Sequence, residues 1–184
     1  GDVITAATES AVTIGGKTYT VASSLASFFK NSNLAGSSMT FTAIGDQITA
    51  INSLNVSNAG KIVGDGTVIT GNVTVTTENV SLQGITVKGA LVVKGNVLGN
   101  VTVNSTVVEG KVVTEETQQT AFHSRMAIAA TDFTPMATTN VTRLHITFND
   151  STVAILEIKS SDSVLSFNGA TVVSLIDVQS NSSI

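Results

Sequence analysis

The chain has 184 residues and a formal net charge of −4, and 42% of its residues are hydrophobic although only 4% are aromatic. It has no basic stripe that could neutralise a phosphate backbone, which argues against nucleic-acid binding. The absence of cysteine excludes thiol chemistry and cysteine-ligated zinc, and no run of about 18 apolar residues predicts insertion into a membrane. The core must be built from Val, Ile, Leu and Ala, small side chains that suit stacked strands.

Residues 1–58 predict a small α+β cap with two β-hairpins. Gly15 and Gly16 lie between two alternating segments, AVTI and KTYTVA, and indicate a tight turn. Gly45 and Asp46 stand in the same way between MTFTAI and QITAINSLNV. Each glycine pair or Gly-Asp pair is typical of a hairpin, because a tight turn needs residues that adopt a positive φ angle.

A short helix is predicted between the two hairpins. Ser23 or Ser24 is a candidate cap for its first turn, since a serine hydroxyl accepts a hydrogen bond from a free backbone N–H there. Leu25, Phe28 and Phe29 follow at a spacing that places them on one side of the helix. We expect this side to face the core.

From residue 59 onward the sequence repeats with a period near 20 residues. NVSLQGITVKGALVV from Asn79 matches NVTVNSTVVEGKVVT from Asn100 at a spacing of 21. One step earlier, ITGNVTV from Ile69 matches VKGALVV from Val87 at a spacing of 18. Such a period is typical of a solenoid, and the short segments ITV and LVV, separated by Gly or Asn, indicate short strands joined by tight turns.

A further repeat lies near the C-terminus, where HITFNDSTVAIL from His145 matches VLSFNGATVVSL at a spacing of 19. The match places these residues on one another: Phe148 on Phe167, Asn149 on Asn168, Thr152 on Thr171 and Leu156 on Leu175. Stacked Phe and Asn are expected where identical strands lie about 4.8 Å apart. We therefore predict an all-β fold, a parallel β-helix (solenoid) over 59–184 with the N-terminal cap. An antiparallel sandwich of short strands would explain the alternation but not the matched Asn, Gly and Phe.

An excursion from the solenoid is predicted at about residues 114–140. This segment is rich in Gln, Ala and Met and poor in β-branched residues over its first half, so we expect it to be helical or irregular. Insertions of this kind commonly carry binding contacts. The candidate contact residues are His123, Arg125, Met126 and Phe133.

The cap pattern GGKTYTV, LASFF, MTFTA, GDQITAI and SLNV, followed by TGNVTV, ENVSLQGITVKGALVV and GNVTVNSTVVEGKVV, resembles a known group of sequences. The similarity is to β-helical domains of surface-layer and related cell-surface proteins of spore-forming Gram-positive bacteria. It covers about residues 12–114 and extends more loosely to the C-terminal repeat. The resemblance implies an exported structural role and no active site.

The sequence contains no persuasive catalytic pattern, so we expect no enzymatic activity and no cofactor or metal. The carboxylates considered for a polysaccharide lyase or hydrolase are Glu115, Glu116, Asp132, Asp150, Glu157, Asp162 and Asp177. A lyase usually needs basic groups along one face, and the only arginines of the chain are Arg125 and Arg143, outside the clearest central repeats. Glu109 aligns with Lys88 in the repeat, which predicts an ion pair between neighbouring strands of the wall.

Both ends of the predicted solenoid invite association, because an unpaired strand edge is a template for further pairing. The N-terminal strand lacks a clear partner in the sequence, and the C-terminal repeat remains strand-like to Val178. The candidate subunit-interface residues are Asp2, Val3, Ile4, Thr5, Ala6, Thr171, Val172, Val173, Leu175, Ile176 and Val178. A non-closing contact between the two ends would form a filament.

The sequence thus predicts a secreted, extracellular structural protein of the cell surface that assembles with itself, head to tail, into a fibre or a surface-layer lattice. The alternative is a non-catalytic module that binds cell-wall polysaccharide through the excursion and the polar wall. A polysaccharide lyase or hydrolase is the third reading. Peptidoglycan binding by a monomeric chain would favour the second reading, and activity on an acidic polysaccharide would favour the third.

Overall fold

The computed structural model describes residues 1–116, 143–160 and 163–179. Within them the chain forms fifteen strands and three short helical turns. The elements of the cap are β1 (Asp2–Ala7), β2 (Ala11–Ile14), β3 (Lys17–Val21), η1 (Ser23–Leu25), α1 (Ala26–Phe29), η2 (Ser32–Leu34), β4 (Ser38–Ile44) and β5 (Gln47–Val56). The elements of the solenoid are β6 (Gly60–Ile69), β7 (Val73–Val75), β8 (Val80–Val87), β9 (Leu91–Val93), β10 (Asn100–Asn104), β11 (Val107–Thr114), β12 (His145–Asn149), β13 (Thr152–Ile158), β14 (Val164–Asn168) and β15 (Val172–Val178). No helix in these ranges is long and apolar enough to cross a membrane.

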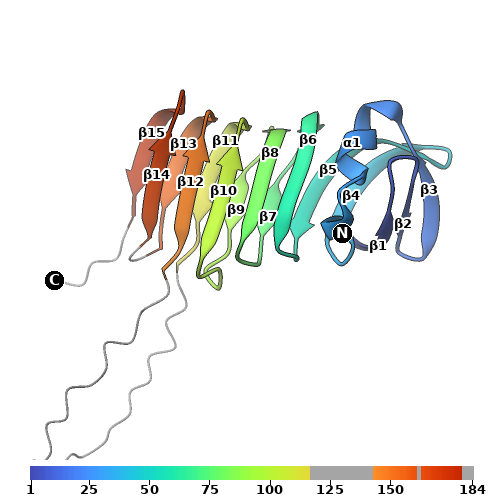
Figure 1. Cartoon of the computed structure of the whole chain (residues 1–184), viewed down its shortest axis with the longest axis horizontal. Coiled ribbons are helices and arrows are strands. Elements are labelled where there is room, and N and C mark those ends of the chain that lie inside the picture. Colours follow the sequence, from blue (N-terminus) through green and yellow to red (C-terminus); the bar gives the residue numbers. More distant parts are fainter. Residues whose placement is uncertain (117–142, 161–162, 180–184) are drawn as a thin grey trace, which may run out of the picture.

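The solenoid makes about five turns, and each turn, called a rung below, contributes strand segments to three parallel stacks (Figure 1). The first stack contains residues 60–63 and 80–83 with β10, β12 and β14. The second contains residues 67–69, 85–87, 107–108, 152–153 and 172–173. The third contains residues 54–56, β7, β9 and residues 112–114, 156–158 and 176–178. The predicted parallel β-helix is confirmed, and the antiparallel sandwich is excluded.

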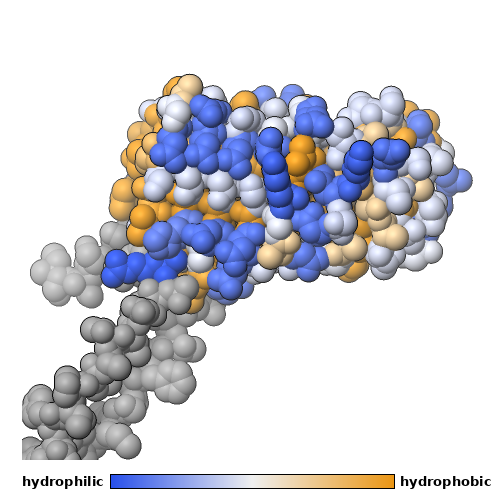
Figure 2. Space-filling view, viewed as in Figure 1, coloured by the Kyte–Doolittle hydropathy of each residue, from blue (hydrophilic) through white to orange (hydrophobic). Residues whose placement is uncertain are grey.

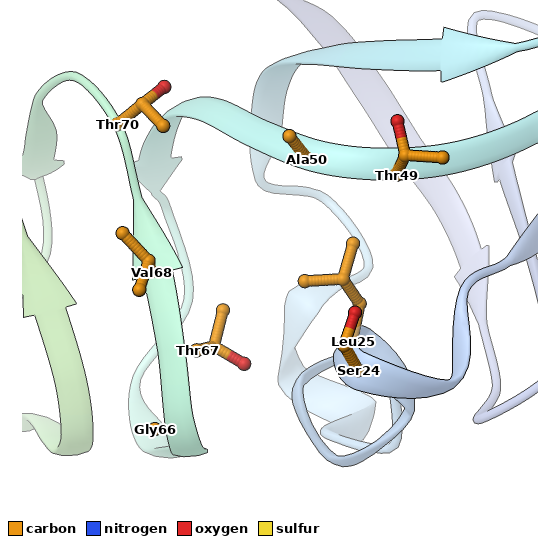
Figure 3. A pocket seen from close by; sticks show the side chains of 8 residues that line it. All are labelled: Ser24, Leu25, Thr49, Ala50, Gly66, Thr67, Val68 and Thr70. Carbon is orange, nitrogen blue, oxygen red and sulfur yellow. The ribbon is translucent and has the colours of Figure 1, made fainter.

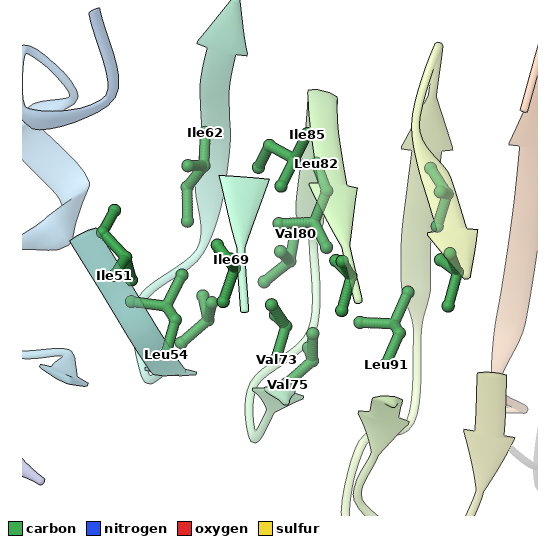
Figure 4. Close-up of a cluster of buried hydrophobic side chains, with 14 of the residues drawn as sticks. Ile51, Leu54, Ile62, Ile69, Val73, Val75, Val80, Leu82, Ile85 and Leu91 are labelled. Atoms are coloured by element: carbon green, nitrogen blue, oxygen red, sulfur yellow. The ribbon is translucent and has the colours of Figure 1, made fainter. Parts of the chain in front are cut away.

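The core is a set of columns in which one apolar side chain lies on the next. In the strand segments before the last rung, alternate residues are buried, as in the pattern of Val73–Val75 and Leu91–Val93. Figure 4 shows these side chains filling the space between the stacks, among them Ile62, Leu82 and Ile69. Small branched residues fit because every rung must present the same width to its neighbours.

The register that the repeats predict is confirmed over most of the solenoid. Val80 pairs with Val101 and Val87 with Val108, which gives the expected spacing of 21. Ile69 pairs with Val87, and β12 pairs with β14 at the expected spacing of 19.

One part of the predicted register is wrong, at the turn that precedes β15. Thr152 pairs with Val172 and not with Thr171, so the spacing between β13 and β15 is 20. The reason is turn length. Two residues separate β12 from β13, whereas three, Gly169 to Thr171, separate β14 from β15. The extra residue moves every later partner by one position.

The cap is a closed ring of five strands in the order β1, β2, β3, β5 and β4, with β4 returning to β1. Both predicted hairpins are confirmed, since β2–β3 and β4–β5 are antiparallel. The predicted helix is shorter than expected and begins without a serine cap, because its N-terminal positions, Ala22 and Leu25, make no side-chain capping bond. The burial of Phe28 and Phe29 holds the helical segment in place instead.

The N-terminal strand is paired on both sides, contrary to the prediction that it lacks a partner. β1 pairs with β2 through Ile4, and it pairs with β4 through Asp2 and Val3. The side chain of Ile4 is fully buried in the cap. The sequence does not reveal this pairing, because β1 and β4 are more than thirty residues apart and no repeat relates them.

The matched glycines of the repeat mark a place where backbones touch. A side chain at Gly110 would lie well inside van der Waals contact of the carbonyl group of Gly89, which in turn lies against the carbonyl group of Gly71. The rungs that carry Gly71, Gly89 and Gly110 thus leave room only for hydrogen at this corner.

We expect Gly110→Ala to lower the free energy of unfolding by about 2 kcal/mol, since overpacking a filled site forces the backbone to shift. Urea unfolding of the variant measures this loss. Glu109→Ala, at the exposed neighbouring position, is the control and should change stability by less than about 0.5 kcal/mol. Equal stability of the two variants would contradict the tight contact.

Candidate assembly surface at the C-terminal end

The last rung, residues 163–179, is called the open rung here because nothing in the described part of the chain pairs with its outer edge. β14 pairs only with β12, and β15 pairs only with β13. Every other described strand pairs with two or more strands. The open rung lies at the opposite end of the molecule from the cap (Figure 1).

The open rung exposes side chains that belong to the core columns. Phe148 is fully buried, whereas Phe167, stacked on it with ring centroids 5.5 Å apart, is 42% exposed. In the third stack, Leu156 is fully buried but its partner Ile176 is 48% exposed, and Val178 is 63% exposed. Figure 2 shows hydrophobic residues along this end of the molecule. An exposed apolar patch of this kind is typical of an interaction surface.

Asparagine side chains form a ladder that ends at the open rung. The Nδ2 atom of Asn149 donates to Oδ1 of Asn104 at 2.6 Å, and Nδ2 of Asn168 donates to Oδ1 of Asn149 at 2.8 Å. Below them, Nδ2 of Asn104 donates to the hydroxyl of Ser81 at 2.9 Å. Each amide therefore donates toward the cap. The Oδ1 atom of Asn168 accepts no hydrogen bond from the described residues, whereas the corresponding atoms of Asn104 and Asn149 each accept one from the next rung.

The ladder predicts unequal losses for the same substitution on two rungs. Asn149→Ala removes two amide hydrogen bonds between rungs, whereas Asn168→Ala removes one at the exposed end. We expect losses in unfolding free energy of about 2 kcal/mol and about 0.5–1 kcal/mol, respectively. Chemical denaturation of both variants measures the difference, and a larger loss for Asn168→Ala would contradict the ladder.

Hydroxyl groups at one corner form a second ladder. The hydroxyl of Ser151 accepts the backbone N–H of Thr106 at 3.3 Å, and the hydroxyl of Thr171 accepts the N–H of Ser151 at 3.3 Å. The N–H of Thr171 has no such acceptor within the described residues, which contain no further rung. Of the groups in these two ladders, the Oδ1 atom of Asn168 and the N–H of Thr171 therefore lack a partner at the open rung, beside the free backbone groups of its two strand edges.

Charged side chains lie in columns on the outer wall close to this end. Nζ of Lys94 lies 2.6 Å from Oε1 of Glu115 on the next rung. Nζ of Lys111 lies 2.9 Å from Oε2 of Glu157, and Nζ of Lys159 lies 2.7 Å from Oε1 of the same carboxylate. None of the ion pairs found in the described ranges joins Lys88 to Glu109, so that prediction is wrong. The sequence anticipates the kind of contact but not its position.

The Glu157 carboxylate should give the fold a sensitivity to acid. The hydrogen bond from Lys159, and then that from Lys111, lower its pKa in the folded chain. A lowered folded-state pKa contributes stability that is present above the unfolded-state pKa and is lost as the pH falls through the folded-state value.

We therefore expect Glu157→Gln to lower the melting temperature at neutral pH and to flatten the loss of stability on acidification. Thermal unfolding of both proteins between neutral and strongly acidic pH measures this. An unchanged slope in the variant would show that Glu157 does not contribute to the acid sensitivity.

The two halves of the predicted interface between subunits lie at opposite ends of the molecule (Figure 1). Asp2, Val3, Thr5 and Ala6 lie exposed on β1 in the cap, while Ile4 is buried. The C-terminal residues form the open rung, where Val172, Leu175, Ile176 and Val178 are exposed and Thr171 and Val173 are half-buried. The interface predicted from the sequence omits Phe167 and Asn168, although the repeat aligns them with Phe148 and Asn149. The predicted excursion contacts His123, Arg125, Met126 and Phe133 lie outside the described residues.

Two pockets in the described part of the chain differ in the character of their lining. One, of about 250 Å³, lies between the cap and the first rung and is lined by Ser24, Leu25, Thr49, Ala50, Gly66, Thr67, Val68 and Thr70 (Figure 3). Its lining contains neither an aromatic nor a charged side chain. A second pocket, of about 220 Å³, is lined by Lys94, Gly95, Asn96, Glu115 and Glu116 and is thus charged.

The candidate carboxylates that the structure describes have wall contacts. Oδ1 of Asp150 accepts the N–H of Ala170 at 2.9 Å, and Oδ2 of Asp177 accepts an amide hydrogen bond from Gln179 at 2.7 Å. Asp132 and Asp162 lie outside the described residues. Among those that are described, no group of three or more His, Asp or Glu is placed to hold a metal ion.

Comparisons of the chain with family models, with curated proteins and with solved structures found no match.

Proposed function

We propose that this chain is an exported, non-catalytic structural protein of a cell surface and that it associates with further copies of itself through the open rung. The observation that carries the proposal is the contrast between the two ends of the solenoid. The cap closes one end with a ring of paired strands, whereas the other end exposes Phe167, Ile176 and Val178 beside two unpaired strand edges. Natural sheets normally cover or charge such an edge.

The composition of the open rung supports the same role. Asp177 is the only charged residue among residues 163–179, and no proline interrupts the strands. An edge with these features favours pairing with another chain over remaining in solvent. The resemblance to surface-layer proteins is consistent with an extracellular site of action.

The paired state of β1 changes the head-to-tail version of the proposal. A strand exchange that used Asp2–Ala7 would have to open the ring of the cap and expose Ile4. The cost of that opening makes the open rung, and not the N-terminal strand, the main element of association. A fibre or a lattice would then need a second contact on the cap or the wall.

The test places one lysine on the open rung and one on the wall. Ile176→Lys introduces a charge at the 48% exposed end of a core column, and Val68→Lys introduces it at a 39% exposed position on the first rung. We expect wild type and Val68→Lys to form assemblies of more than one copy, measured by sedimentation and negative-stain microscopy, and Ile176→Lys to be monomeric.

Val178→Lys, at a 63% exposed position, is a second variant in case Ile176→Lys fails to fold. A wild-type chain that stays monomeric at all concentrations would refute the proposal. Binding of purified peptidoglycan by that monomer would instead favour a cell-wall polysaccharide-binding module. Cleavage of an acidic polysaccharide would favour a lyase or hydrolase.

A further inference from the structure

We propose that two copies associate tail to tail, with the open rung of each packing on the open rung of the other about a two-fold axis. This inference rests on the proposed function and specifies the contact through which it operates.

Wholly unpaired strand edges occur at only one end of the described part of the chain. Each strand of the cap pairs with two others, so the ring leaves no strand without a partner on one side. At the edge of β6, Nδ2 of Asn31 donates to the carbonyl of Val63 at 2.8 Å and Oδ1 of Asn31 accepts the N–H of Val63 at 3.0 Å. The amide thus takes the place of a neighbouring strand at Val63, and β6 also pairs with β5 at Ile69.

It follows that β14 and β15 are the only described strands with a wholly unpaired edge. Two identical copies that pair through these wholly unpaired edges use the same surface on both sides. A contact of that kind is isologous and closes after two copies. The facing strands run antiparallel, an arrangement that strand edges accept readily.

The unpaired polar groups of the two ladders at this end are complementary to the same groups of a second copy. The Oδ1 atom of Asn168 is an acceptor without a donor, and the N–H of Thr171 is a donor without an acceptor, three residues away on the same turn. An isologous contact matches one group with the other twice. A two-fold axis near this turn would place the donor of each copy opposite the acceptor of its partner.

The open rung is a mainly apolar surface with little charge. Phe167, Ile176 and Val178 are apolar, and half-buried Leu165 and Val173 lie beside them. The open rung consists of the 17 residues 163–179, fewer than the roughly 20–30 residues that each partner contributes to an interface of standard size, so we expect a contact of modest area. Its single charged residue limits like-charge repulsion between copies.

The experiment uses single cysteines, which are unambiguous because the chain has none of its own. Ser174→Cys places a thiol at an exposed position of β15, and Ile44→Cys places one at the exposed tip of the β4–β5 hairpin in the cap. Each variant, and an equal mixture of the two, is treated with a short bismaleimide crosslinker at low concentration. Products are resolved by denaturing gel electrophoresis.

We expect Ser174→Cys alone to give a covalent dimer and Ile44→Cys alone to remain monomeric. Adding Ile176→Lys to Ser174→Cys should abolish the dimer. Crosslinking confined to the mixture would overturn the tail-to-tail contact in favour of head-to-tail stacking while leaving the proposed function intact. No crosslinking in any sample, together with a monomeric mass of the wild type, would overturn both.

Discussion

Phe148→Ala should lower the free energy of unfolding by about 3–5 kcal/mol, whereas Phe167→Ala should lower it by only about 1 kcal/mol. The two residues are of the same type and occupy the same column, and their rings are stacked at 8°. They differ in position: Phe148 is fully buried between rungs, and Phe167 is 42% exposed at the end. Removing a buried ring leaves a cavity that the surrounding strands cannot close.

The pair of variants also separates stability from association. Phe167→Ala should weaken self-association, because it removes apolar surface from the open rung, while the monomer stays folded. Circular dichroism during urea unfolding gives the stability, and sedimentation gives the association. Equal losses of stability in the two variants would mean that the end of the solenoid is covered in solution in a way that the described residues do not show.

Ile4→Ala should cost about 2–5 kcal/mol, although Ile4 lies four residues from the start of the chain. Its side chain is fully buried inside the ring of the cap, and β1 closes that ring by pairing with β2 and β4. Val3→Ala is the matched control, since Val3 is 49% exposed on the same strand and should change stability by less than about 0.5 kcal/mol.

Thermal unfolding of Ile4→Ala and Val3→Ala, together with hydrogen exchange of the backbone amides of the cap, tests whether β1 is part of the folded cap. A large loss in Ile4→Ala alone would show that β1 is part of the folded cap. Equal, small losses would mean that β1 is free to leave the ring, and the strand-exchange form of head-to-tail assembly would regain support.

Repeated residues made the solenoid predictable, because parallel rungs stack each residue on its counterpart. Asn79 and Asn100, or Phe148 and Phe167, reveal the stacking from the sequence alone. The sequence does not reveal the partner of Thr152, because Thr171 and Val172 both fit a strand position opposite it. The one extra residue in the turn before β15 therefore leaves no trace in the pattern.

Contacts between elements without a repeat were harder to predict. Glu157 meets Lys111 across the segment at 114–140, so the spacing of 46 residues hides a pair that lies on adjacent rungs. The closure of the cap by β1 was missed for a similar reason, because hairpin signals predict neighbours in sequence and not the return of β4 to β1. The open rung was identified, since its strand pattern continues to Val178.

If the tail-to-tail contact holds, it limits how assemblies grow. A two-fold contact makes a pair with a cap at each outer end, and growth beyond the pair depends on the caps or the walls. Exposed apolar residues of the wall, such as Val107 and Ile155, are 37% and 38% exposed and lie on adjacent rungs. Lateral packing through such residues would favour a lattice of pairs over a simple fibre.

Hydrogen exchange of the backbone amides, followed at increasing protein concentration, tests most directly whether the open rung is the surface of association. If the open rung is that surface, amide exchange in β14 and β15 slows as the protein concentration rises, because their outer edges become hydrogen-bonded or covered. Amide exchange in β1 to β4 stays constant. Exchange that is independent of concentration throughout the chain, or that slows in the cap and not in the open rung, would contradict it.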